Sequence, residues 1–263
     1  MQEASADHLF QTAQARIADN DLLREPQREA HAKVRTYFAT QRAPAIVQIP
    51  VGCGKTGLIA ILPFGIATGR VLIIAPNVTI RSGVARALDI ANPDCFWRKT
   101  RVLPSVAEGP FCAILDGPDA NIHDCTESHF VITNIQQLAS SADRWLPQFP
   151  PGFFDMILVD EGHHNVADSW RKVFERFPDA KVVSLTATPF RSDGQRPTGE
   201  IVYRYPFTKA MLQGYIKQID SLDQLRPGRD LLQLQRRRAP AHARRGPGTP
   251  GRGVVQARCG PGS

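Results

Sequence analysis

The chain has 263 residues, of which 42% are apolar, enough for one large α/β domain or two small ones. No apolar stretch reaches the roughly 18 residues of a membrane span, and the N-terminus lacks the basic start and apolar centre of a signal peptide, so we expect a soluble cytoplasmic protein. The five cysteines are odd in number and form no CxxC pair. They therefore indicate reduced thiols rather than a disulfide framework or a zinc ribbon.

The net charge of +7 is concentrated at the C-terminus. Residues 224–263 carry nine arginines and one acidic side chain, a net charge of +8, whereas residues 1–223 carry 23 basic and 24 acidic side chains, a net charge of −1. The last forty residues are dominated by Arg, Pro, Gly and Ala and contain no Phe, Tyr, Trp, Ile or Met. Such a segment cannot build a core, so we predict one domain over residues 1–222 and a disordered tail over 223–263.

Two explanations compete for this tail. Its arginines could bind nucleic acid by neutralising phosphates, with strong salt dependence. Alternatively, the residues it lacks include those with AT-rich codons, which favours out-of-frame translation of a GC-rich gene.

Apolar runs and helical spacings alternate along residues 1–222. Pro26 favours a helix start and leads into a helical segment at 27–41. Helical spacing also recurs at 55–67 and 78–91, and apolar runs predict buried strands at 45–49, 71–75, 111–115, 130–133, 156–160 and 181–185. Strands alternating with helices predict an α/β fold with a mostly parallel sheet and helices on both of its faces.

The stretch "AIVQIPVGCGKTGLIAIL" (45–62) predicts a phosphate-binding loop between a strand and a helix. Gly52 and Gly54 let the backbone wrap phosphates closely. Lys55 is expected to reach the β- and γ-phosphates of ATP, and the Thr56 hydroxyl to bind Mg²⁺. The strict GxxxxGK[ST] pattern needs glycine at position 49, where this chain has isoleucine. The predicted ATP contacts in this loop are Gly52, Cys53, Gly54, Lys55, Thr56 and Gly57.

Two adjacent carboxylates end the apolar run "FFDMILVDEGHH". Asp160 is expected at the carboxyl end of a central strand, the edge where open α/β sheets bind ligands. There Asp160 would hold Mg²⁺, and Glu161 would orient and deprotonate the water that attacks the γ-phosphate.

Six motifs in order resemble those of superfamily 2 DEAD/DEAH-box helicases, in the style of the type III restriction subunit (ResIII) branch. They are "LREPQREA", "IPVGCGKTG", "IIAPNVTI", "VITNIQQL", "VDEGHH" and "SLTATPFR", over about residues 20–220. The resemblance implies a phosphate-loop NTPase with a RecA-like three-layer αβα fold that uses ATP and Mg²⁺.

The resemblance also implies roles at the matching positions. Gln27 would contact the adenine with support from Arg24, and His163 would link the hydrolytic site to the "SLTATPFR" motif. Thr186 and Thr188 would couple the nucleotide state to the grip on nucleic acid. The positions that would touch a nucleic-acid backbone, DNA rather than RNA, are Pro76, Asn77, Thr133 and Asn134. Ordinary polar residues after buried strands would account for Asn77 and Asn134 equally well.

Zinc is the rival interpretation for the histidines. His163 and His164 are adjacent, so on a continuing strand they would point to opposite faces and could not share one ion. His123, Cys125 and His129 lie near Cys112 in the sequence, but their spacing matches no common zinc site.

The last forty residues leave no room for a second RecA-like domain, which in this family would supply an arginine finger. The chain is therefore expected to be the ATP-binding domain of a truncated helicase or translocase, which hydrolyses ATP very slowly by itself. The alternatives are a nucleotide-binding subunit of a split restriction or defence motor, completed by a partner chain, a non-catalytic nucleic-acid-binding module, and a phosphate-loop ATPase without a nucleic-acid role.

Overall fold

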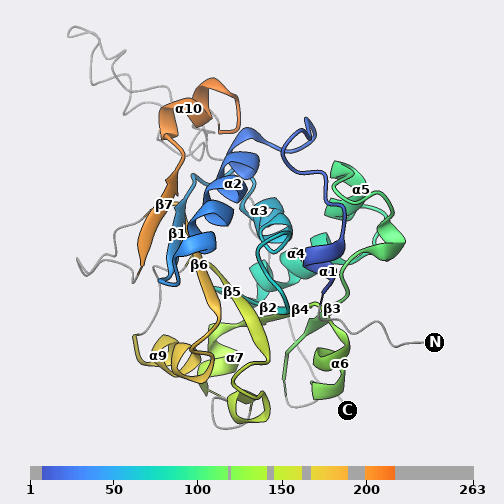
Figure 1. The fold of residues 1–263 in the computed structure, drawn as a ribbon, viewed down its shortest axis with the longest axis vertical. Helices are drawn as coiled ribbons and strands as arrows, with labels where there is room; N and C mark the ends of the chain where they lie inside the picture. The colour runs from blue at the N-terminus through green and yellow to red at the C-terminus, as the bar shows by residue number, and fades with distance from the viewer. Residues whose placement is uncertain (1–7, 118–119, 141–144, 162–166, 189–198, 217–263) are drawn as a thin grey trace, which may run out of the picture. The chain divides into compact units, whose positions relative to one another are not determined.

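Seven parallel strands form one sheet, in the order β3-β4-β2-β5-β6-β1-β7 (Figure 1). The computed structural model of the chain describes residues 8–117, 120–140, 145–161, 167–188 and 199–216. The strands are β1 (Ala45–Gln48), β2 (Arg70–Ala75), β3 (Cys112–Ile114), β4 (Phe130–Asn134), β5 (Phe154–Asp160), β6 (Lys181–Thr186) and β7 (Glu200–Arg204). All six strands predicted from apolar runs are confirmed, within one or two residues at their ends.

β7 was not predicted. It pairs with β1 at the edge of the sheet, and most of its residues are exposed or half-buried. Because an edge strand buries little of its surface, it needs no long apolar run, and its sequence, "EIVYR", has only three such residues between two charged ones.

Helices cover both faces of the sheet. The helices along the chain are α1 (Leu9–Thr12), α2 (Glu25–Thr40), α3 (Lys55–Ile61), α4 (Val78–Leu88), α5 (Phe96–Thr100), α6 (Ile122–Glu127), α7 (Ile135–Ser140), α9 (Ala167–Arg176) and α10 (Phe207–Leu212). Helices α1 to α5 lie on one side of the sheet, and α6, α7 and α9 lie on the other (Figure 1). The expected three-layer αβα arrangement is therefore present.

Two hydrophobic clusters fill the spaces between these layers. Along β2, Val71 and Ile73 belong to the cluster beneath α2 to α4, whereas Leu72 and Ile74 belong to the cluster beneath α7 and α9. Successive side chains of a strand point to opposite faces, so a strand buried on both sides must be apolar throughout. This requirement explains why the central strands read as continuous apolar runs.

Three predicted helix boundaries are wrong in detail, and one is the end of the spacing over 78–91, since α4 ends at Leu88. The helical spacing over 55–67 predicted a longer helix than α3, which ends at Ile61. Pro63 explains the early end, because it has no N–H to donate to the carbonyl four residues earlier in a continuing helix. Helix α2 begins at Glu25, so Pro26 occupies its second position rather than its first.

The carboxyl ends of all seven strands face the same edge of the sheet, because the strands are parallel. The phosphate loop follows β1, the Asp160 carboxylate ends β5, and Thr186 ends β6, which lies between them in the sheet. Residues that are far apart in the sequence therefore lie close together at the carboxyl-end edge of the sheet.

Clustering of contacts divides the chain into two units, Met1–Gln218 and Ile219–Ser263, and all described residues lie in the first. Within these residues, no helix is both long and apolar enough to cross a membrane.

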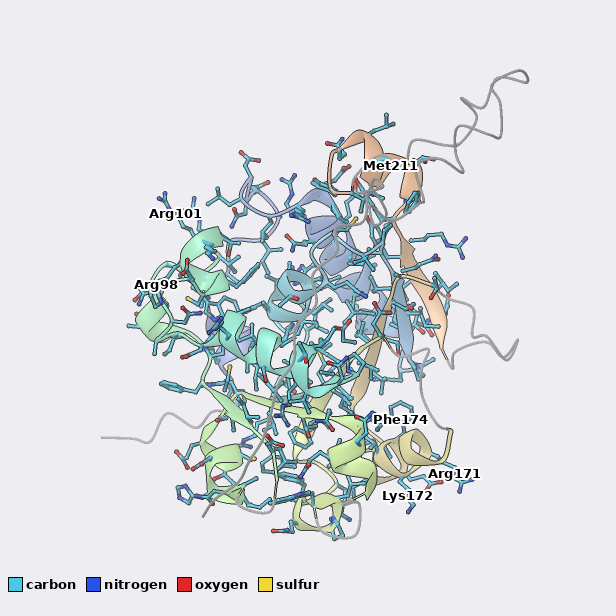
Figure 2. The ribbon with its side chains drawn as sticks, turned by 180° about the vertical axis from the view of Figure 1, so that it is seen from behind. Arg98, Arg101, Arg171, Lys172, Phe174 and Met211 are labelled. Atoms are coloured by element: carbon cyan, nitrogen blue, oxygen red, sulfur yellow. The ribbon has the colours of Figure 1, made fainter. Side chains whose placement is uncertain are left out.

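Exposed basic side chains extend from separate elements, with Arg98 and Arg101 around α5 and Arg171 and Lys172 on α9 (Figure 2). The predicted boundary at residue 222 and the tail lie outside the described residues.

Candidate active site

The loop between β1 and α3 turns at two glycines in the left-handed region. The φ angles are +92° at Gly52 and +89° at Gly54, values that strain any residue with a Cβ. A Cβ at Gly52 would also lie 2.8 Å from the carbonyl oxygen of Tyr215. Between the glycines, Cys53 is buried, and its N–H donates to the Pro50 carbonyl over 3.2 Å. Only glycine satisfies both the conformation and the space at Gly52.

Ile49 occupies the position where the strict phosphate-loop pattern has glycine. Its side chain is fully buried in the core, and its N–H donates to the Thr186 carbonyl over 2.9 Å. The isoleucine is therefore part of the packing beneath the loop, and its backbone joins the loop to the end of β6.

Gln27 connects the start of α2 to the phosphate loop. Its Oε1 accepts a hydrogen bond from the Arg24 N–H over 2.8 Å, and its Nε2 donates to the Gly54 carbonyl over 2.8 Å. The Arg24 guanidinium donates to the Gly52 carbonyl. A Cβ at Gly57 would collide with the Gln27 side chain, so close packing requires glycine there as well. The predicted adenine motif and the phosphate loop thus form one hydrogen-bonded unit.

Lys55 brings the two predicted carboxylates together. Its ammonium forms an ion pair with Glu161, and its Nζ lies 3.7 Å from Asp160 Oδ1. All three side chains are largely buried, with Asp160 only 7% exposed. Glu161 has a positive φ of 54°, uncommon for a non-glycine residue, and its N–H donates to the Leu185 carbonyl over 2.9 Å. Such conformations are concentrated at functional sites.

Burial shifts the titration of this cluster. Loss of solvation raises the pKa of the Asp160 carboxyl above its usual value, although the nearby Lys55 opposes the shift. Loss of solvation likewise lowers the pKa of the Lys55 ammonium, against the attraction of Asp160. Asp160 Oδ1 is buried without a hydrogen-bond partner among the described residues. A cation at this oxygen would compensate for a buried charge that the protein leaves poorly satisfied.

Thr186 and Thr188 form a local turn beside this cluster. The Thr186 hydroxyl donates to the Thr188 carbonyl over 2.7 Å and accepts the Thr188 N–H over 3.1 Å. The backbone carbonyls at the end of β6 also accept hydrogen bonds from the Ile49 and Glu161 N–H groups. The turn is therefore linked through the backbone to both the phosphate loop and the carboxylates. The predicted role of His163 lies outside the described residues.

The four residues predicted to contact nucleic acid lie at the same edge of the sheet: Pro76 and Asn77 follow β2, and Thr133 and Asn134 are the last two residues of β4. Asn77 Oδ1 accepts from the Ile80 N–H over 2.9 Å and caps α4, and Asn134 Oδ1 accepts from the Gln137 N–H over 2.8 Å at the start of α7. Thr133 is fully buried, and its hydroxyl donates to the Leu115 carbonyl over 3.1 Å. Pro76 is half-buried. All three polar side chains among the four predicted residues therefore have structural partners already.

The side chains considered for zinc have other environments. His129 Nδ1 accepts the Phe111 N–H over 3.0 Å, and burial raises the pKa of the Cys112 thiol to about 12 and that of Cys125 to about 11. Over the described ranges, no group of three or more His, Cys, Asp or Glu side chains is close enough to hold a metal ion. His163 and His164 are outside those ranges.

The sequence reasoning missed the segment of residues 200–216, which packs against α2. Tyr203 donates to Glu29 over 2.6 Å, and Tyr205 donates to Glu25 over 3.1 Å. Burial and the neighbouring carboxylates raise the pKa of both tyrosines. The apolar run in "EIVYRY" is too short to indicate a strand, and no local pattern indicates that this segment packs against α2.

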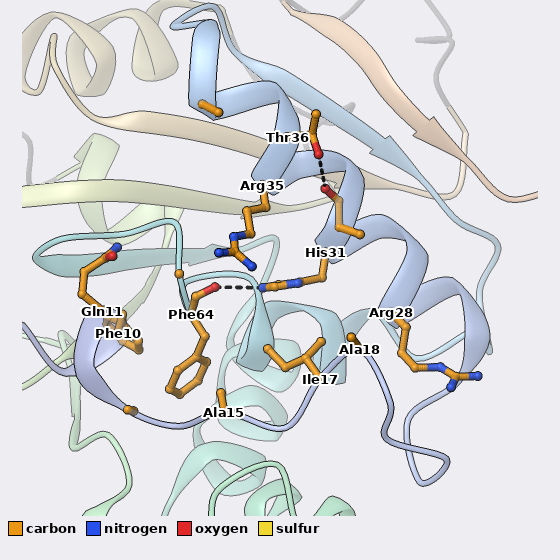
Figure 3. A pocket seen from close by; sticks show the side chains of 14 residues that line it. Phe10, Gln11, Ala15, Ile17, Ala18, Arg28, His31, Arg35, Thr36 and Phe64 are labelled. Atoms are coloured by element: carbon orange, nitrogen blue, oxygen red, sulfur yellow. Dashed lines mark hydrogen bonds between the residues drawn. The ribbon is translucent and has the colours of Figure 1, made fainter.

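A cavity of about 680 Å³ lies between α2 and the N-terminal segment (Figure 3). Its lining includes Arg28, His31 and Arg35 of α2 and the apolar side chains of Phe10 and Phe64. His31 Nε2 lies 2.9 Å from the Phe64 carbonyl, and burial lowers the pKa of this imidazole. The cavity shares no residue with the cluster around Lys55, so it is separate from the candidate active site.

Comparison with known proteins identifies the family. Residues 20–191, which include β1 to β6 and every described residue of the cluster, match the family described as "Type III restriction enzyme, res subunit" (ResIII). The chain belongs to the ResIII family. A curated relative, the type I restriction enzyme EcoAI endonuclease subunit of Escherichia coli, is 33% identical over 75 residues, which are 26% of this chain and 9% of the relative.

Solved structures of helicases and of a restriction-modification enzyme share the fold of this ResIII domain. The Hef helicase domain of Pyrococcus furiosus has a TM-score of 0.54 and 19% identity, over 78% of this chain and 42% of that one. The type ISP restriction-modification enzyme LlaGI, solved with a DNA substrate mimic, has a TM-score of 0.51 and 18% identity, over 73% and 20%. UvsW of bacteriophage T4 has a TM-score of 0.50 and 17% sequence identity, over 73% of this chain and 36% of that one. The chain thus spans less than half the length of each, and the shared feature is the RecA-like fold.

Proposed function

We propose that the ResIII domain binds ATP with Mg²⁺ and hydrolyses it, and that hydrolysis drives movement along DNA. The observation that carries this proposal is the convergence of Lys55, Asp160 and Glu161 beside a loop with two left-handed glycines. A cation, two carboxylates and a glycine loop at one sheet edge are parts that phosphoryl transfer from a nucleotide needs.

Each end of the nucleotide has a set of residues suited to it. Arg24 and Gln27 would recognise the base, and the loop from Gly52 to Gly57, including Cys53 and Gly54, would surround the phosphates. Lys55 would exchange its carboxylate partners for the β- and γ-phosphate oxygens, which are stronger competitors for a partly desolvated ammonium.

The chemistry of the carboxylates fits a magnesium ion. Oxygen ligands are what Mg²⁺ prefers, and Asp160 Oδ1 is a buried carboxylate oxygen without a hydrogen-bond partner among the described residues. Thr56 and Asp160 would hold the ion, which would neutralise charge on the phosphates. Glu161 would accept a proton from the attacking water, while Thr186 and Thr188, with His163, would relay the change to the nucleic-acid contacts.

DNA is the nucleic acid that we propose as the track. Membership of a restriction-enzyme family, the similarity to the EcoAI endonuclease subunit and the DNA complex of LlaGI support DNA over RNA. The sugar-phosphate backbone of a DNA strand would pass along four residues, Pro76, Asn77, Thr133 and Asn134. Contacts of this kind position the nucleic acid without reading its sequence.

The decisive experiment measures nucleotide binding and hydrolysis in purified protein. Lys55→Ala should weaken Mg²⁺–ATP binding by about tenfold or more, because it removes the cation for the phosphates. Glu161→Gln should retain ATP binding and lower the hydrolysis rate by about 10²-fold or more, the usual contribution of a general base.

Lys99→Ala is the matched control, because Lys99 is an exposed lysine on α5 whose partner is the exposed Asp94. It should behave like the unmodified protein in both assays. If ATP bound equally well to the Lys55→Ala protein, the proposed site would be wrong. Hydrolysis that duplex DNA does not stimulate would count against the proposed track.

A second candidate is the nucleotide-binding subunit of a split restriction motor. The restriction relative spans far more sequence than the part it shares with this chain, which favours a function shared with further domains or chains. Under this alternative, a separate chain with a second RecA-like domain should co-purify and raise ATP hydrolysis by about 10³-fold or more, the effect of an arginine finger in related enzymes.

A further inference from the structure

A hydrogen bond and an ion pair join the 200–216 segment to the start of α2. Tyr205 donates to Glu25 over 3.1 Å, and Lys209 forms an ion pair with the same carboxylate. The Lys209 ammonium also lies 5.3 Å from the centroid of the Tyr205 ring. Glu25 directly follows Arg24, so these contacts fix the backbone next to the residue proposed to support the base.

Tyr215 lies where this segment crosses the phosphate loop. Its ring centroid is 5.1 Å from the guanidinium carbon of Arg24, within the range of a cation–π contact. The same guanidinium donates to the Gly52 carbonyl, and the Tyr215 carbonyl oxygen is the nearest atom to a Cβ placed at Gly52. Arg24 is therefore held by a ring and by the loop, although the residue as a whole remains exposed.

This arrangement suits a planar ligand. A guanidinium is flat and stacks on aromatic rings, so the side that does not face a tyrosine can stack on a purine. A free arginine side chain would have to lose its rotamer freedom when a base binds. A ring that already holds Arg24 removes part of that cost before the nucleotide arrives, which is preorganisation.

We infer that Tyr215 is a positioning residue for the nucleobase, acting through Arg24 and not by touching the base itself. The inference rests on the proposed ATP site and adds a residue beyond those that the phosphate-loop motifs contain. It also gives the 200–216 segment a role in nucleotide affinity.

The test compares two ligands, Mg²⁺–ATP and Mg²⁺–tripolyphosphate, by isothermal titration calorimetry. Tripolyphosphate has the phosphates without the base, so it reports on the loop alone. The variants are Tyr215→Leu, which removes the aromatic ring, and Tyr215→Phe, which keeps it. Thermal unfolding of each variant verifies that the domain remains folded.

Tyr215→Leu should weaken ATP binding by about two- to fivefold, the ratio that corresponds to a cation–π contact at an exposed site, and leave tripolyphosphate binding unchanged. Tyr215→Phe should bind both ligands like the unmodified protein. Unchanged ATP binding by Tyr215→Leu would overturn the inference. Equal losses for both ligands would also overturn it, because Tyr215 would then act through the phosphate loop at Gly52.

A double-mutant cycle with Arg24→Ala tests the route of the effect. If Tyr215 acts through Arg24, Tyr215→Leu should weaken ATP binding no further in the Arg24→Ala protein. Additive losses would mean that the ring contacts the base directly, which contradicts a positioning role. Failure of the unmodified protein to bind either ligand would instead refute the proposed function, so the two failures are distinguishable.

Discussion

Asp160 is a buried carboxylate whose environment favours function over stability. Its Oδ1 has no hydrogen-bond partner in the described part of the chain, and burial raises the pKa of the group. Asp155, on the same strand, has the opposite environment. It accepts hydrogen bonds from the Thr68 N–H and hydroxyl and pairs with Lys181 at 3.0 Å. The two aspartates should therefore respond differently to the same substitution.

Asp160→Asn should leave the melting temperature unchanged or raise it, because it removes a desolvated charge. The same change should abolish the Mg²⁺ dependence of ATP affinity, measured by titration with and without the ion. Asp155→Asn, the control, should lower the melting temperature and keep the Mg²⁺ dependence. A large loss of stability in Asp160→Asn alone would show that this carboxylate is structural.

Local sequence was sufficient to predict the positions of the glycine loop after β1 and of the paired carboxylates after β5, whereas their roles toward a nucleotide stay predictions. Gly52, Gly54 and Lys55 lie within four positions of one another, so one short pattern contains them. The partners of Gln27 were not predictable in the same way, because the Gly54 carbonyl is 27 residues away and backbone carbonyls carry no sequence signal.

At the scale of elements, α4 begins at a residue with two candidate roles. Asn77 is predicted to contact a nucleic-acid backbone, and its side chain caps the helix. The two roles can be separated, because aspartate caps a helix as well as asparagine does but repels phosphate.

Asn77→Asp should keep the stability of the domain, whereas Asn77→Ala should cost about 1 kcal/mol of unfolding free energy in denaturant titrations. If Asn77 also contacts the backbone, Asn77→Asp should weaken DNA binding at low salt. DNA affinity that is unchanged in Asn77→Asp would leave the cap as the sole function of this side chain.

β7 and α10 illustrate what helical and strand periodicity cannot predict. The Tyr203–Glu29 and Tyr205–Glu25 hydrogen bonds join residues 174 and 180 positions apart. Five of the six predicted strands lie inside the sheet, where burial on both faces demands apolar runs. The edge strands β3 and β7 have no such requirement, and only β3 lies in an apolar run long enough to be predicted.

At the scale of the whole molecule, positive charge is separated from the proposed catalytic unit. Residues 224–263 have a net charge of +8 and residues 1–223 a net charge of −1. Nonspecific attraction to DNA should therefore depend mainly on the tail, whatever its origin.

Deleting residues 224–263 should leave ATP affinity unchanged and flatten the dependence of DNA affinity on salt. The slope of log K against log salt should fall by about 0.9 for each arginine that contacts a phosphate of duplex DNA. Fluorescence anisotropy of labelled DNA over a series of salt concentrations measures this slope. An unchanged slope would assign DNA binding to the ResIII domain itself.

The sequence by itself determined the α/β class, the parallel strands, the glycine turn between β1 and α3, and the position of the pair Asp160–Glu161 at the carboxyl end of β5. It did so because apolar runs report burial, and because parallel strands place their carboxyl ends on one edge. Only the tertiary structure decided that Gln27 holds the phosphate loop, that β7 completes the sheet beside β1, and that Tyr215 lies against Arg24. Those contacts join segments far apart along the chain, and no local pattern specifies which distant segment will be the partner.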